Sequence, residues 1–281
     1  MGEWGMIIQS APEGEVSGKR FVIKLAEHLE LVGQFAENFG NADFATPEPR
    51  EEFLYACRWH DKGWQDLDDN PPLNPDTGLP HNLVETPLPI ILLTSARSPE
   101  HNEGHNPYCG LIDSMHIWGL YNGRYGMSDK VLINMIPDEH RLLADTMLSN
   151  EFQRQQRLKA TLRNDPKTSA WVEDGPLFAN YKALQFFDTL ALYFNCTHAA
   201  GRGESVFEHV PMNAESDTTI TVCRLDDTIY SLDPYPFSEN ELEVSFEGRY
   251  LVPHDVGNNP DMEAIMRDTP RERQSVTLVM A

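Results

Sequence analysis

The chain has 281 residues, and its 44 acidic side chains outnumber 22 basic ones to give a formal net charge of −22. This length allows one large domain or two small ones, and the acidic balance argues against a nucleic-acid groove or an anionic membrane surface as partner. No apolar run approaches the roughly 18 residues that span a bilayer, and residues 1–10 lack the basic patch and apolar stretch of a signal peptide.

The four cysteines are widely spaced and form no CxxC pair. A disulfide framework or a cysteine-based zinc site is therefore not expected, and we expect a cytoplasmic protein.

Helical periodicity and stop signals predict six helices, at about 26–39, 51–61, 89–97, 107–121, 137–162 and 177–195. Alternating apolar patterns predict short strands at about 6–9, 21–25, 218–224, 228–232, 241–246 and 275–280. Between the second and third helices, residues 65–89 carry six prolines, which indicates a long loop that could form a lid or wall of a site. A polar break containing His101 and His105 is expected before the fourth helix.

This order predicts a mainly α fold. Residues 1–203 are expected to form a helical domain, with short strands within residues 5–25. Residues 204–281 are expected to form a small antiparallel β region packed on that domain and not independent of it. The N-terminal strands could join this β region.

Two His-Asp dipeptides occur, at His60-Asp61 and His254-Asp255. The second lies in a Pro-, Gly- and Asn-rich segment and is read as part of a loop. The first ends a helix whose apolar stripe includes Phe53 and Cys57. An ionisable pair at the buried end of such a stripe must be hydrogen-bonded or metal-bound, since leaving it unpaired costs several kcal/mol.

Similar residues interrupt the apolar faces of three other predicted helices. His28 lies among Leu25, Leu29 and Val32, and Asp188 lies between Leu184 and Ala191. On the fourth helix, His116 follows Asp113 by one turn. Each residue alone is more often a satisfied core or capping residue, but several together favour one shared metal site. Imidazole and carboxylate ligands suit one or two divalent transition-metal ions such as Fe, Mn, Zn or Ni.

The order His28, His60-Asp61, Asp188 on successive helices resembles the HD-domain superfamily of metal-dependent phosphohydrolases. More closely, the chain is similar to a bacterial family of uncharacterised HD-like proteins. The segments that carry this resemblance are EHLELVGQFA (27–36), HDKGW (60–64), PDTGLP (75–80), SMH (114–116), LQFFDTLAL (184–192) and DPYPF (233–237).

The resemblance implies an HD-like helical bundle in which His28, His60, Asp61 and Asp188 are metal ligands. It also implies that Asp61 is catalytic and able to bridge two ions. Superfamily members with two metals use two further histidines, for which His116 is the first candidate and His81 and His105 are loop candidates.

Three residues near these motifs are candidate substrate contacts. Lys62 could contact an anionic group, and Trp64 could form the wall of a pocket, although a surface role and a packing role are equally or more common. Arg124 lies in a glycine-bearing loop after the His116 helix.

Three functions remain open. The first is metal-dependent hydrolysis of a small phosphorylated substrate, in which a metal-activated water attacks phosphorus. The second is a di-iron oxygenase acting on a small molecule, which needs about six protein ligands and therefore His81 and His105 folded inward. The third is a non-catalytic ligand-binding protein. The oligomeric state is not readable from the sequence.

Overall fold

The computed structural model describes residues 5–12, 14–68 and 71–281, so parts of the predicted N-terminal domain and of the 65–89 loop lie outside the described residues. Its largest element is one eight-stranded sheet with the order β3-β1-β2-β7-β8-β6-β5-β4. The strands are β1 (Gly5–Ile8), β2 (Arg20–Ile23), β3 (His81–Asn82), β4 (Ser205–Pro211), β5 (Asp217–Arg224), β6 (Ile229–Asp233), β7 (Glu241–Leu251) and β8 (Glu272–Met280).

The sheet is mixed. β1 pairs with β3 and β6 pairs with β8 in parallel, whereas the other neighbours are antiparallel. The N-terminal strands are part of this sheet because β2 pairs with the end of β7, with Phe21 opposite Tyr250. Strands from the two ends of the chain therefore share one set of backbone hydrogen bonds.

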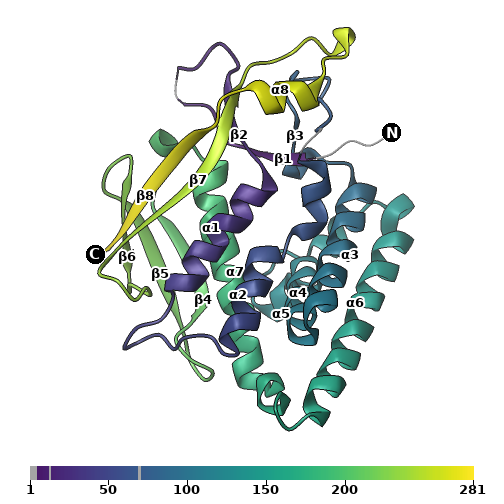
Figure 1. Cartoon of the computed structure of the whole chain (residues 1–281), viewed down its shortest axis with the longest axis vertical. Helices are drawn as coiled ribbons and strands as arrows, with labels where there is room; N and C mark the ends of the chain where they lie inside the picture. Colours follow the sequence, from purple (N-terminus) through teal and green to yellow (C-terminus); the bar gives the residue numbers. More distant parts are fainter. Residues whose placement is uncertain (1–4, 13, 69–70) are drawn as a thin grey trace.

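The helices are α1 (Leu25–Asn38), α2 (Arg50–Trp59), α3 (Leu88–His105), α4 (Pro107–Tyr121), α5 (Gly123–Gly126), α6 (Asp138–Asn164), α7 (Asp174–Cys196) and α8 (Met262–Asp268). In Figure 1, α1 and α7 lie between the sheet and the group formed by α2, α3, α4 and α6. The contacts agree, since α1 packs on β7 and α7 on β4 while both also contact other helices.

One hydrophobic core joins helices and sheet. Phe35 of α1 stacks on Phe237, which follows β6, at a ring-centroid distance of 5.9 Å, and it also meets Phe194 of α7. Both helices thus bury one face against the sheet and leave another face for the remaining helices. Core residues come from both sides of residue 203.

The prediction of a mainly α fold with a small antiparallel β region is wrong, because the chain forms an α/β fold with a large mixed sheet. The prediction missed β4, in which a β-bulge between Phe207 and Val210 interrupts the alternation of buried and exposed residues. The prediction that the N-terminal strands could join the C-terminal strands is confirmed, since β2 pairs with β7 over more than 200 residues of sequence.

The predicted break at His101 and His105 is also wrong, because α3 continues through both residues. These two side chains are partly solvent-exposed at the edge of the contact with α2, while Ser98 and Asn102 are buried on the inner face of the helix. The polar residues in this segment therefore belong to the exposed side of a continuous helix and do not indicate that the helix ends. Among the helices of the described residues, none combines the length and apolar character needed to cross a membrane.

Gly63 offers a test of the packing between α3 and the segment after α2. A Cβ atom at this position would overlap the backbone carbonyl oxygen of Thr94, which cannot rotate away. We expect Gly63→Ala to lower the free energy of unfolding by about 1–3 kcal/mol. Urea denaturation measures this change.

Gly104→Ala in α3 is the matched control, because nothing lies within 4 Å of a Cβ atom built there. It should raise the free energy of unfolding by about 0.5–1 kcal/mol, since alanine is the better helix former. Equal effects of the two substitutions would contradict the close approach at Gly63.

Candidate metal centre

Five of the predicted ligand residues come together at the meeting point of four helices. His28 comes from α1 and Asp188 from α7, while His116 comes from α4. His60 caps the C-terminus of α2, and Asp61 follows it. Their possible ligand atoms form two groups within 4.8 Å, His28/His60/Asp188 and His60/Asp61/His116.

His60 links the two groups. Its Nδ1–H donates to the carbonyl oxygen of Cys57 at 2.9 Å, which leaves Nε2 to face the centre. Nε2 lies 3.8 Å from Asp61 Oδ2 and 3.8 Å from Asp188 Oδ1, beyond hydrogen-bond distance from either. The ring is fully buried, and this nitrogen has no hydrogen-bond partner among the described residues.

His28 is oriented in the same manner. Its Nδ1 contacts the side-chain oxygen of Asn195 at 3.0 Å, and its Nε2 lies 3.2 Å from Asp188 Oδ1. A donating Nδ1–H leaves a lone pair on Nε2 directed at a carboxylate oxygen. Only a proton or a metal cation between these two atoms makes the contact favourable.

His116 contacts the side-chain amide of Gln185 through Nδ1. In the structure the amide nitrogen of Gln185 faces this Nδ1. With the amide turned over, its oxygen accepts the Nδ1–H and Nε2 of His116 carries the lone pair. A second residue that holds the outer nitrogen of the ring is the usual arrangement around metal-binding histidines. All three imidazoles therefore have a partner for Nδ1.

The cluster concentrates negative charge around the histidines. Burial alone would lower the pKa of His60, but the carboxylates of Asp61 and Asp188 outweigh it and raise this pKa to about 9. Burial opposes ionisation of Asp188 too, yet its contacts with His28 and His60 hold the pKa of this carboxyl well below its usual range. Burial and the neighbouring His60 lower the pKa of His116 to about 3. The centre thus favours one positive charge at His60 Nε2.

These residues fit a divalent transition-metal ion. Ligand atoms about 2.0–2.2 Å from one ion lie roughly 3–4 Å from one another, and the separations of 3.2 and 3.8 Å fall in this range. The donor set of imidazoles and carboxylates suits iron, manganese, zinc or nickel. An imidazole nitrogen has a single lone pair, so Nε2 of His60, at which the two groups meet, can bind only one ion.

A buried polar layer supports the centre. Asp113, one turn before His116 on α4, is fully buried and accepts a hydrogen bond of 2.7 Å from Asn102. Asn102 also donates to the carbonyl oxygen of Trp59, immediately before His60. The C-terminus of α2 and the His116 helix are thereby tied to the same side chain of α3.

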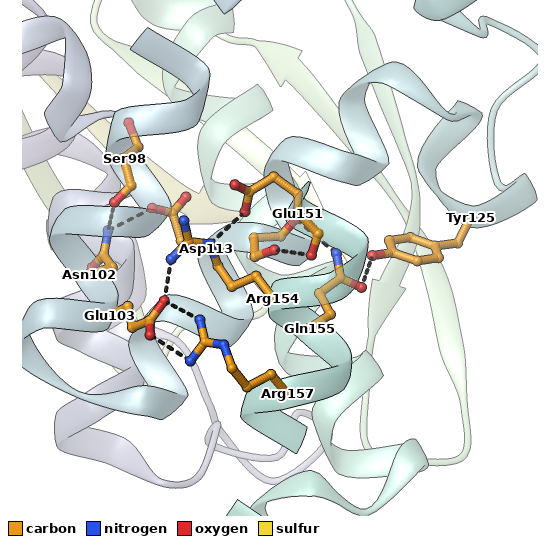
Figure 2. A network of polar contacts seen from close by, with 10 residues as sticks. Ser98, Asn102, Glu103, Asp113, Tyr125, Glu151, Arg154, Gln155 and Arg157 are labelled. Atoms are coloured by element: carbon orange, nitrogen blue, oxygen red, sulfur yellow. Dashed lines mark hydrogen bonds and ion pairs between the residues drawn. The ribbon is translucent and has the colours of Figure 1, made fainter. Parts of the chain in front are cut away.

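Figure 2 shows this layer beside a second polar network that joins α3, α4 and α6. Arg154 of α6 pairs with Glu103 of α3 and with the buried Glu151, which it contacts at 3.0 Å. Gln155 of α6 donates to the Ser114 carbonyl oxygen of α4 at 3.0 Å. These contacts hold α4 between α3 and α6 and so fix the position of His116.

The segment after Asp61 is tied to α1 as well. Asp68 accepts hydrogen bonds from the backbone N–H groups of Leu25 and Ala26, at 2.9 and 3.0 Å. A carboxylate at this end of a helix satisfies free N–H groups and complements the helix dipole. It therefore sets the helix that carries His28 against the segment that carries His60 and Asp61.

The structure does not bring the two loop candidates to the cluster. His105 is exposed and stacks on Tyr55, with ring centroids 3.5 Å apart. His81 is buried in β3, where neither ring nitrogen has a hydrogen-bond partner among the described residues. Neither histidine belongs to the metal-ligand groups found in the described part of the chain.

The predicted substrate contacts have different surroundings. Lys62 donates to Gln65 Oε1 at 2.7 Å and lies over the ring of Trp59. Trp64 is 5% exposed and belongs to the hydrophobic core, so its observed role is packing. Arg124 lines a pocket near the centre.

Sequence reasoning missed the residues that hold the histidines. Gln185 and Asn195 lie three residues before and seven residues after Asp188 on α7, a spacing that places all three on one helix face. Polar residues at these intervals on an otherwise apolar face were the available signal.

Comparison with known proteins gives one match. A family described as "Protein of unknown function (DUF3891)" matches residues 6–252. The chain belongs to this family. No curated protein and no solved structure matches the chain.

The predicted membership of the HD-domain superfamily is therefore wrong. The match is to the DUF3891 family, and the eight-stranded mixed sheet differs from an HD-like helical bundle. The match also gives no support to the hydrolase activity that this resemblance implied. The resemblance failed because its motifs describe local ligand positions on helices, which do not determine the topology of the remaining chain.

Asp113 gives a test of the buried layer. Burial raises the pKa of this carboxyl well above its usual value. Because its folded pKa is the higher one, its contribution to stability is present below the unfolded pKa of about 3.9 and is lost as pH rises through the folded value. Asn at this position keeps the oxygen that accepts from Asn102 and does not titrate.

We therefore expect the stability of Asp113→Asn relative to the unsubstituted protein to increase with pH, by at most about 1.4 kcal/mol per pH unit. Urea denaturation of both proteins at pH 5, 6, 7 and 8 measures the difference. A difference that stays constant over this range would refute the assignment of a neutral Asp113.

Proposed function

We propose that the protein is a metal-dependent hydrolase of a small phosphorylated substrate. His28, His60, Asp61, His116 and Asp188 would hold the metal. The observation that carries this proposal is the buried Nε2 of His60, which has no partner among the described residues and lies 3.8 Å from two carboxylates. Such an atom is costly unless a cation binds it.

A bound divalent ion would lower the pKa of water and withdraw charge from a phosphoryl oxygen. The residues themselves supply orientation. The Cys57 carbonyl and Asn195 fix the rings of His60 and His28, and Asp188 contacts both histidines.

Asp61 is the cluster carboxylate with the greatest access to solvent. Its side chain is 16% exposed, compared with 8% for Asp188 and 1% or less for His28 and His60. This position lets Asp61 hold an attacking water through one oxygen and accept its proton. We therefore assign Asp61 as the catalytic residue among the ligands.

The di-iron oxygenase reading is less well supported. It needs His81 and His105 as additional ligands, and neither joins the groups formed by the described residues. Five protein ligands around a shared histidine suit a single centre better than a pair of complete iron sites. A non-catalytic binding protein would not require Asp61 to be the exposed member of the centre.

Metal analysis is the first test. We expect the protein, purified without chelator, to contain about one divalent transition-metal ion per chain, measured by elemental mass spectrometry. His60→Ala should lose this metal, because it removes the residue that links both groups.

His254→Ala is the matched control, since it alters the second His-Asp dipeptide, which lies outside the regular helices and strands. It should keep the metal. Absence of metal from the unsubstituted protein, or its full retention by His60→Ala, would overturn the proposed centre.

Activity is the second test. Phosphate release from a panel of small phosphate monoesters should depend on added metal, and Asp61→Asn should lower kcat on the order of a hundredfold or more. Oxygen consumption by the iron-loaded protein, without any phosphate release, would favour the oxygenase instead.

A further inference from the structure

A second feature lies next to Gln185, the partner of His116 Nδ1, and none of the five proposed metal ligands lines it. It is a pocket of about 270 Å³ between α7, β4 and the turn formed by α5. Basic side chains from these three elements line it, namely Arg124, Lys182 and His209. We call it the Arg124 pocket. Its volume suits a small molecule or one substituent of a larger one.

Arg124 is the free cation of this pocket. Its guanidinium has no hydrogen bond or ion pair with any other residue in the described ranges, whereas Lys182 pairs with Asp217. Glu208 also lines the pocket but is an exposed residue of β4. The Lys182 charge is thus offset by Asp217, and Arg124 retains its full capacity for an anion.

The backbone holds Arg124 in an unfavourable conformation. Arg124 and Tyr125 have φ values of 50° and 58°, between Gly123 and Gly126, which also have positive φ. His209, on the opposite wall of the pocket, has φ 58° in the β-bulge. Non-glycine residues rarely adopt this region, and such residues cluster at functional sites. Two of the three basic residues of the pocket, Arg124 and His209, therefore have this left-handed backbone conformation.

Gln185 connects the pocket to the metal centre. It lines the pocket and its side-chain amide contacts Nδ1 of His116. The end of this amide that points away from His116 is buried and lacks a hydrogen-bond partner among the described residues. Thr189, next to Asp188, lines the pocket as well. The wall of the pocket is therefore built on the residues that position the ligands.

We propose that the Arg124 pocket binds a phosphate group of the substrate other than the one that reacts at the metal, with the guanidinium of Arg124 donating to its oxygens. This inference rests on the proposed function and names the residue that recognises its substrate class. Arginine presents parallel N–H donors that match phosphate oxygens. It supplies the local positive charge that the acidic chain otherwise lacks.

Binding of inorganic phosphate, measured by isothermal titration calorimetry on the protein as purified, tests the proposal. Arg124→Gln should weaken phosphate binding about tenfold to a hundredfold and leave the metal content unchanged. Lys130→Gln is the matched control, because it removes one positive charge from an exposed residue of the same loop that does not line the pocket. It should change the affinity less than about twofold.

Arg124→Gly separates binding from folding. Glycine adopts positive φ without strain, so this variant should keep the thermal midpoint of unfolding at least at the original value. It should nevertheless lose phosphate affinity to the same extent as Arg124→Gln. A variant that is stable and retains the affinity would overturn the proposal.

Phosphate binding that is equal in the unsubstituted and Arg124→Gln proteins, or absent from both, would also overturn the proposal. Either result leaves the metal analysis of His60→Ala unaffected, so the metal centre can stand while the pocket fails. If instead the protein holds no metal, Arg124-dependent phosphate binding by the metal-free chain would support the pocket alone.

Discussion

The helical half of the molecule depends on burying two carboxylates and three imidazoles at one point. Ionisable groups that are moved out of water cost several kcal/mol each unless they find charged or hydrogen-bonding partners. Here each histidine directs Nδ1 at a polar partner, and the carboxylates flank His60 Nε2. The proposed cation at the centre would compensate both carboxylates at once and so lower the cost of burying them.

The burial of these five side chains also depends on the position of the sheet. α7 carries Asp188, Gln185 and Asn195 on one face and packs on β4 with another, while α1 carries His28 and packs on β7. A shift of the sheet would move both helices and separate the ligands. The mixed sheet is therefore the support that sets α1 and α7 side by side, and Asp68 fixes the start of α1 against the His60 segment.

The sequence predicted which ionisable residues interrupt the helix faces better than it predicted the fold, for a physical reason. His28, His116 and Asp188 interrupt apolar stripes of period 3.6, a local pattern that any single helix displays. The sheet instead depends on pairing between residues far apart in the sequence, such as Phe21 with Tyr250. In β4, a bulge at His209 interrupts the alternation of buried and exposed residues by which a strand is predicted. His105 could not be placed by local reasoning, because its stacking on Tyr55 is a contact between two helices.

The net charge of −22 is compatible with the proposed anionic substrate, because electrostatic interactions at the surface act only over short distances. Exposed charges are largely screened beyond a Debye length of about 8 Å at physiological ionic strength. The phosphate groups of the proposed substrate would respond mainly to the nearest positive charges, which are Arg124 in the pocket and the cation proposed beside Asp61 and Asp188. The surrounding acidic surface slows the approach of an anion but does not decide whether it binds. Since Lys182 is paired with Asp217, recognition falls on the one guanidinium that the left-handed turn holds at the pocket wall.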